Sequence, residues 1–168
     1  MTQISEAQKG NITKEIQQVA EFEKIDEEKI RRRVASGKIV IPFNKIHSPN
    51  ALGIGKGLRV KVNANIGTSR EHCDFDEEIK KAKVSVEAGA HALMDLSTGK
   101  DLDKLREKLL KTVDIPFGTV PIYQAGIQSI SKHGAIVDMT EDDMFNTFEH
   151  QAKQGVDFAV VHVGVTRV

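Results

Sequence analysis

Four side chains with binding chemistry stand at or near the ends of successive apolar segments: Asn65, Met94, Tyr123 and His162. The first three are spaced 29 residues apart, and His162 follows 39 residues after Tyr123. An amide, a phenol and an imidazole exchange hydrogen bonds, and a thioether packs against apolar groups. Singly, each has an ordinary explanation: a turn cap for the asparagine and core packing for the others. Together, at the ends of successive strands, they are predicted to converge on one ligand pocket.

The elements that carry these residues alternate between short strands and longer helices. The expected strands lie in the sequences LRVKVNANI, ALMDLS, FGTVPIY and DFAVVHVGV. The expected helices span residues 74–88, 101–112 and 140–154, and a loop or hairpin at 126–138 explains the longer last interval. This order is typical of βαβ units and a parallel sheet.

The predicted fold class is α/β, with roughly the first half of a (β/α)8 barrel of the TIM type. A doubly wound open sheet alternates in the same way, but its glycine-rich phosphate turn is missing after the first strand. Side chains along that strand alternate between a polar face, with Lys61, Asn63 and Asn65, and an apolar face, with Val60, Val62, Ala64 and Ile66. We expect the apolar face to pack on helices and the polar face to lie inside the barrel, where it needs hydrogen-bond partners.

A helical segment is expected before the barrel, over residues 1–37, and the half-barrel over residues 38–168. Thr13 and Asp26 are placed to cap two of its helices, and Gly37 is placed to end the second. Each cap is a side-chain oxygen directly before a segment with helical apolar spacing. The chain is therefore expected to have a small helical preface and one larger unit.

Two glycine-containing stretches are candidate anion sites. GIGKG at 53–57 matches neither the P-loop nor the dinucleotide fingerprint, so we expect a flexible entry to the first barrel strand. LSTGKD at 96–101 precedes a helix N-terminus, where an anion can bind, although a simple capping turn fits equally well.

Composition narrows the class of protein. Lys plus Arg and Asp plus Glu both total 24 in 168 residues, which argues against a nucleic-acid partner. No apolar segment has the length of a membrane span and the first residues are polar, so we expect a cytoplasmic protein without a membrane partner. The single cysteine, Cys73, allows no internal disulfide and no cysteine-rich metal site, and the histidines lack zinc-ligand spacing.

Several motifs, in order, give the chain a specific likeness: AQKGNIT, KVNANIGTS, MDLSTGKDL, GTVPIYQA, DMTEDDMF, QGVDF and HVGVT. Nearly the whole chain resembles the amino-terminal part of the phosphomethylpyrimidine synthase family, which includes the anaerobic paralogue 5-hydroxybenzimidazole synthase. The resemblance implies a (β/α)8 barrel that binds aminoimidazole ribotide. The substrate contacts that it places in this half are Asn65, Met94, Tyr123 and His162.

The resemblance also implies a radical lyase that uses S-adenosylmethionine and a 4Fe-4S cluster to make the thiamin pyrimidine phosphate, and that forms a homodimer when complete. The family's zinc and cluster ligands lie in a carboxyl-terminal part that this chain lacks, so no metal site is expected here and the fragment alone should be inactive. Phe43 and Ile46 replace a small residue and an amide of the family pattern, so the loop at 41–47 is not expected to have its usual role. Val163 follows His162, where the family commonly has Ala or Cys.

Two alternatives stay open on the sequence. The product of the same substrate is either the thiamin pyrimidine or 5-hydroxybenzimidazole, a precursor of the cobalamin lower ligand. A function of another class is a non-catalytic half-barrel that binds a ribotide or a partner chain.

Overall fold

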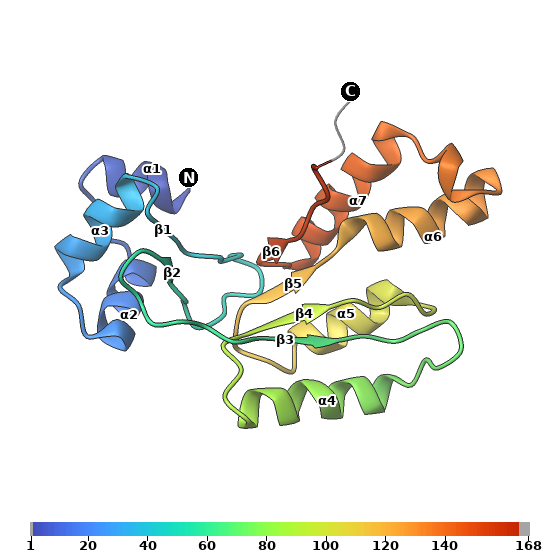
Figure 1. Ribbon diagram of the computed structural model, residues 1–168, viewed down its shortest axis with the longest axis horizontal. Coiled ribbons are helices and arrows are strands. Elements are labelled where there is room, and N and C mark those ends of the chain that lie inside the picture. The colour runs from blue at the N-terminus through green and yellow to red at the C-terminus, as the bar shows by residue number, and fades with distance from the viewer. Residues whose placement is uncertain (1, 165–168) are drawn as a thin grey trace.

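The computed structural model describes residues 2–164. An N-terminal lobe of three helices, α1 (Gln3–Gln8), α2 (Lys14–Glu23) and α3 (Glu27–Ala35), lies beside a mixed α/β part (Figure 1). The predicted caps are confirmed: the Thr13 hydroxyl accepts the N–H of Ile16 at 3.2 Å, and the Asp26 carboxylate accepts the N–H of Lys29 at 3.0 Å. Both caps satisfy N–H groups that the first helical turn leaves without partners.

The core of the lobe extends beyond residue 37. Strands β1 (Ile39–Val40) and β2 (Ile54–Gly55) pair antiparallel, and Ile39, Ile41 and Ala51 are buried with apolar residues of α2 and α3. The expectation of a flexible entry at 53–57 is wrong, because this stretch contains β2.

The second part holds a four-stranded parallel sheet in the order β3 (Asn63–Ile66), β4 (Ala92–Asp95), β5 (Phe117–Thr119) and β6 (Phe158–Ala159). The elements between the strands are α4 (Phe75–Glu87), α5 (Leu102–Leu110), α6 (Pro121–His133), the 3-10 helix η1 (Ile136–Asp138) and α7 (Glu141–Gln154). The predicted alternation of strands and helices is confirmed, within a few residues at each helix end.

The predicted loop or hairpin at 126–138 is wrong. Most of it is the carboxyl-terminal half of α6, which continues directly from β5 and forms a helical hairpin with α7 (Figure 1). Pro121 starts α6, where its missing N–H costs no hydrogen bond, and Gly134 ends it with φ +96°. Gly126 lies within the helix, and a β-carbon on it would lie 3.6 Å from the Ile136 side chain.

The helices cover one face of the sheet, which we call the outer face. Ile66, Leu93 and Phe117 of the strands pack there on a buried layer that includes Ala82 of α4 and Leu105 of α5. Helix α7 joins the same face, because the Thr119 hydroxyl donates to the Gln151 side chain at 2.6 Å. The inner face carries the alternate residues: Asn63, Asn65, Ala92, Met94, Gly118 and Phe158.

The first strand is shorter than predicted. Ala64 and Ile66 pack on the helices as expected, but Val60 is 90% and Val62 57% exposed, so that part of the prediction is wrong. Lys61 does not point into the inner face either, since its ammonium binds the buried carboxylate of Glu23 on α2. The ion pair ties this stretch to the N-terminal lobe, and regular pairing begins only at Asn63.

Candidate functional site

Asn65 and Met94 form the best-defined part of the predicted site. They are direct register partners on β3 and β4, so the 29-residue spacing corresponds to adjacent positions on the inner face. Asn65 is exposed and its side-chain oxygen accepts a hydrogen bond from the Asn63 amide at 2.9 Å. This bond leaves the amide N–H groups of Asn65 for a ligand, and the half-buried thioether of Met94 lies beside them.

A cavity of about 490 Å³ adjoins the inner face. Its lining includes Asn63, Met94 and Phe158 from the sheet and Ile54 from β2. Gly118 permits this arrangement, because a β-carbon there would lie 2.3 Å from the Phe158 ring. The volume falls within the range of small-molecule sites, and the lining is mostly apolar but includes Arg59 and Lys61. Of the four predicted site residues, Met94 is among its lining residues and Asn65, Tyr123 and His162 are not.

Tyr123 and His162 are placed differently from the prediction. Tyr123 is not at a strand end but in the first turn of α6, where its N–H donates to the Val120 carbonyl at 3.0 Å. Tyr123 is 38% exposed. His162 is exposed and lies three residues beyond the end of β6 at Ala159. Strand register therefore joins Asn65 to Met94, while the other two residues lie on the segments that follow β5 and β6.

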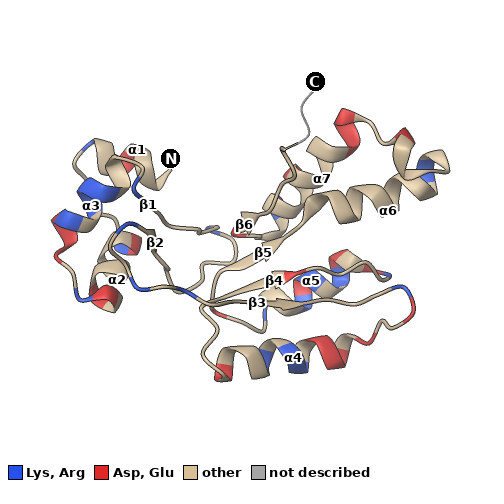
Figure 2. Ribbon diagram, viewed as in Figure 1, with Lys and Arg blue, Asp and Glu red and all other residues tan. Residues whose placement is uncertain are grey.

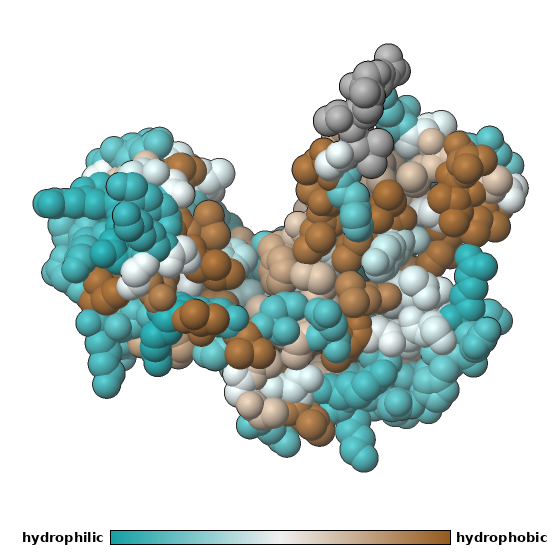
Figure 3. Space-filling view, viewed as in Figure 1, coloured by the Kyte–Doolittle hydropathy of each residue, from teal (hydrophilic) through white to brown (hydrophobic). Residues whose placement is uncertain are grey.

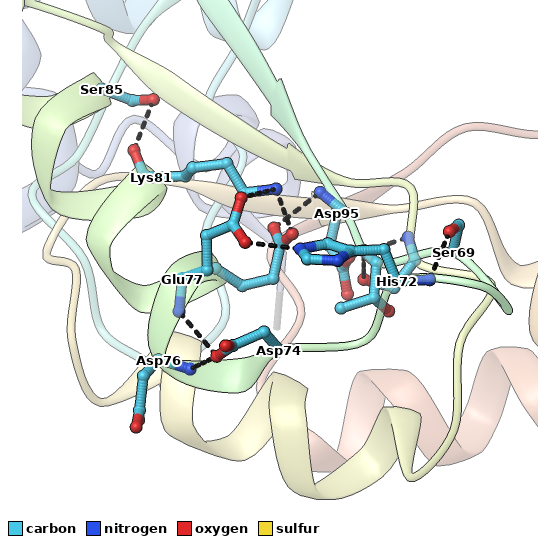
Figure 4. Close-up of polar contacts among 12 residues, drawn as sticks. Ser69, His72, Asp74, Asp76, Glu77, Lys81, Ser85 and Asp95 are labelled. Atoms are coloured by element: carbon cyan, nitrogen blue, oxygen red, sulfur yellow. Dashed lines mark hydrogen bonds and ion pairs between the residues drawn. The ribbon is translucent and has the colours of Figure 1, made fainter.

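The turn after Asn65 is held by backbone and carboxylate contacts. Gly67 has φ +154°, and a β-carbon on it would lie 2.8 Å from the backbone of Leu96 and Ser97. Its N–H donates to the carboxylate of Glu78 on α4 at 2.8 Å, and Glu78 is also paired with Lys81. Figure 4 shows this cluster of charged side chains where α4 meets the end of β3.

The neighbouring strand end is fixed in a similar way. Asp95, directly after Met94, is buried on the outer face and accepts the N–H of Ser97 at 2.9 Å. The Ser97 hydroxyl in turn accepts the N–H of Thr68 at 3.0 Å, which links the loops after β3 and β4. Burial raises the pKa of Asp95 above its usual range, and the hydrogen bonds from Ser97 oppose the shift. The sequence reasoning did not single out Asp95 or Glu78.

A buried polar network holds α6, and with it Tyr123. Gln124 accepts a hydrogen bond from the Arg106 guanidinium at 2.7 Å and another from the Gln151 amide at 2.8 Å, and it donates to Asp103 at 2.8 Å. The three partners come from α5 and α7. The first turn of α6 is thus fixed to two helices on the outer face.

The 42–50 segment is bound to the amino-terminal ends of β5 and β6. Asp157 accepts three hydrogen bonds: from the His47 ring at 2.6 Å, from the N–H of Asn44 at 2.7 Å and from the N–H of Phe117 at 2.8 Å. The second His47 ring nitrogen lies 2.9 Å from the Val113 carbonyl oxygen. Because both ring partners are acceptors, the geometry fits a charged imidazolium. Phe43 and Ile46, which differ from the family pattern, make none of these contacts.

The pKa of His47 is raised. Burial by itself lowers it, but the hydrogen bonds to Asp157 and to the Val113 carbonyl outweigh that effect. The side chains of His47 and Asp157 are 4% and 0% exposed, so the pair is shielded from solvent screening.

Metal ligands are not gathered in the described part of the chain. Within residues 2–164, no group of three or more His, Cys, Asp and Glu side chains is placed to hold a metal ion. Cys73 is exposed and is the single cysteine of the sequence, so these residues do not fit an iron-sulfur cluster. None of the helices over this range is long and apolar enough to cross a membrane.

Together, the parallel sheet and the helices on one of its faces define an α/β protein, in which Asn65 and Met94 lie side by side near the carboxyl-terminal ends of two strands. The chain belongs to the Radical SAM ThiC family, which it matches over residues 2–168. It is 54% identical over 168 residues to a phosphomethylpyrimidine synthase of Pyrococcus abyssi, and 52% identical to that of Pyrococcus furiosus. It is also 51% identical over 166 residues to phosphomethylpyrimidine synthase 2 of Methanothermobacter thermautotrophicus. Each match covers 99% of this chain and 39% of the relative.

Proposed function

We propose that the chain is the amino-terminal part of a phosphomethylpyrimidine synthase, which rearranges aminoimidazole ribotide to the hydroxymethylpyrimidine phosphate of thiamin biosynthesis. The observation that carries the proposal is that Asn65 and Met94 are register partners near the ends of adjacent strands. The chain that holds them is 54% identical to a phosphomethylpyrimidine synthase. The protein works in the cytoplasm, and as a homodimer once complete.

The sheet is the first half of a (β/α)8 barrel in this proposal. Its helices lie on one face, as barrel closure requires, whereas a doubly wound sheet has helices on both faces. Strands β3 and β6 end the sheet on either side, and the remaining strands of the barrel would pair with them.

The substrate would lie across the inner face at the carboxyl-terminal ends of the strands. The Asn65 amide would donate to the imidazole or ribose, and Met94 would pack against the ring. Tyr123 and His162 would supply further hydrogen bonds from α6 and from the segment after β6. The network around Gln124 would keep Tyr123 in place on α6.

The family description implies S-adenosylmethionine and an iron-sulfur cluster in the complete enzyme. When bound, this pair supplies the radical that starts the rearrangement. The cluster does not fit the residues of this chain, so we assign its ligands, and those of a zinc ion, to the remaining part of the protein. This chain contributes substrate binding and exclusion of water.

The proposal is tested with the complete enzyme, incubated anaerobically with aminoimidazole ribotide and S-adenosylmethionine. Mass analysis of the product should find the pyrimidine phosphate; 5-hydroxybenzimidazole would overturn the proposed product. Asn65→Ala and His162→Ala should each abolish turnover while the circular dichroism spectrum is retained. Asn146→Ala, an exposed amide on α7, is the matched control and should keep full turnover. Near-normal rates in both site variants would remove these residues from the site.

The coding sequence after residue 168 distinguishes the enzyme from a non-catalytic half-barrel. A Cys-x-x-Cys-x-x-x-x-Cys motif there, or in a complementing chain, supports the enzyme. A stop codon with no complementing reading frame nearby would contradict it.

A further inference from the structure

A second concave site lies between the loops after β3 and β4 and the carboxyl-terminal half of α6. The cavity measures about 310 Å³. Its lining is Arg70, Thr98, Gly99, Lys100, Ile127, Ile130 and Ser131. It is separate from the cavity on the inner face, with which it shares no lining residue.

The charge of this cleft is positive. Arg70 comes from the loop after β3 and Lys100 from the loop after β4, and none of the described residues that line the cleft is acidic. Asp101, the nearest carboxylate in sequence to Lys100, is paired with Lys104 at 3.3 Å. The loops that leave β3 and β4 both carry basic segments on the side where α6 lies (Figure 2).

The start of helix α5 is adjacent to the cleft in sequence. Helix α5 starts directly after Lys100 and Asp101, and Asp101 makes no side-chain cap, but none of the residues of α5 lines the cleft. The simple capping turn that fitted the sequence LSTGKD is therefore not formed by this residue. Thr98 belongs to the lining, and its hydroxyl donates to the Thr68 carbonyl at 3.5 Å. The hydroxyl of Thr68 lies behind Gly99, outside the lining, and has no hydrogen-bond partner in the described structure.

The cleft and Tyr123 share one face of α6. Tyr123, Ile127 and Ile130 follow the i, i+4, i+7 spacing that places helical side chains in a row. A ligand that contacts Tyr123 can therefore extend along α6 towards Arg70 and Lys100.

We propose that this cleft, which we call the Arg70–Lys100 cleft, binds the oxyanion of a small molecule, either a phosphate or a carboxylate. The two cations would approach the oxyanion from separate loops, and Ile127 and Ile130 would pack against the apolar part of the ligand. The inference rests on the cleft alone and holds independently of the proposed reaction.

Equilibrium dialysis of this chain with radiolabelled inorganic phosphate, ribose 5-phosphate and methionine tests the inference at low ionic strength. We expect saturable binding of at least one probe, weakened about tenfold or more in the Arg70→Gln, Lys100→Gln double variant. Added salt should weaken it as well, because the cations are exposed. A preference for ribose 5-phosphate assigns a phosphate ligand, and a preference for methionine assigns a carboxylate; both support the site.

Lys83→Gln is the matched control, because Lys83 is exposed on α4 outside the cleft. It should bind the probes as the unaltered chain does. Thermal unfolding followed by circular dichroism should be the same in all variants, since the altered side chains are exposed. The absence of saturable binding, or equal binding by the double variant and the unaltered chain, would overturn the proposal.

Discussion

Replacing Asp157 by alanine should destabilise the protein more than any surface change. Its carboxylate accepts hydrogen bonds from the N–H of Asn44, the N–H of Phe117 and the His47 ring, at distances between 2.6 and 2.8 Å. The Asp157 side chain is 0% exposed, so water cannot replace these bonds without entering the core. The variant would leave three donors without an acceptor, one of them a buried cation.

The size of the effect follows from these contacts. A buried donor left without a partner costs about 1–3 kcal/mol, and breaking a buried ion pair costs about 3–5 kcal/mol. Because the contacts form one network, they are not additive, and we expect a loss of about 3–5 kcal/mol in the free energy of unfolding. A domain is typically stable by about 5–15 kcal/mol, so this loss is a large share of the total.

Urea unfolding followed by circular dichroism measures this loss. Asp157→Asn, which keeps the shape and one acceptor oxygen, should lie between the alanine variant and the unaltered chain. Asp138→Ala, an exposed carboxylate in η1, is the control and should change the free energy by less than about 0.5 kcal/mol. A loss below about 1 kcal/mol for Asp157→Ala would refute the reasoning that the 44–47 segment is held by this carboxylate.

Three further predictions follow from the contacts described above. Folding raises the pKa of His47 above 6.5, so the contribution of His47 to the free energy of unfolding is fully present below pH 6.5 and is lost as pH rises through the pKa of the folded state. Unfolding curves of His47→Gln should lack this pH dependence. The same pH dependence in the variant and the unaltered chain would count against an imidazolium. Gly67→Ala should lower the free energy of unfolding by at least about 1–3 kcal/mol, because φ is +154° and the new β-carbon would meet the backbone of the loop after β4. An unchanged midpoint of urea unfolding would contradict the described turn. Open sheet edges and exposed apolar side chains, which include Val60, Val137 and Phe145, should make the chain self-associate in sedimentation velocity, and a single monomeric species would disprove it.

The apolar surface in the last prediction is visible in the space-filling view. Brown regions lie over β6 and over the far end of the α6–α7 hairpin, the second of which is on the side of the molecule away from the N-terminal lobe (Figure 3). Val137 is 89% and Phe145 70% exposed in these elements. Such side chains usually face another element or another chain.

Local patterns predicted much of the fold. Thr13, Asp26 and Thr140 each begin a helix because a side-chain oxygen stands where the first turn has free N–H groups. Alternating strands and helices predicted the parallel sheet, and the 29-residue spacing of Asn65 and Met94 proved to be direct strand register. These features depend on contacts within a few residues or on a regular repeat.

Long-range contacts account for the errors. Lys61 fitted the polar face of a strand by alternation, but its ammonium binds Glu23, 38 residues away, and this pairing moves the start of β3 to Asn63. The interval between the last two strands predicted a loop or hairpin at 126–138, but α6 continues to His133, and its first turn is held by the contacts of Gln124 with α5 and α7.

The sequence by itself determined the family, the order of the elements and the adjacent positions of Asn65 and Met94, because these follow from motif order, capping chemistry and period. Only the tertiary structure decided that Tyr123 lies on a helix, that Asp157 holds the 44–47 segment, and that Arg70 and Lys100 line one cleft. Each of these depends on residues brought together from different loops and helices, and local propensity contains no information on which distant groups will meet.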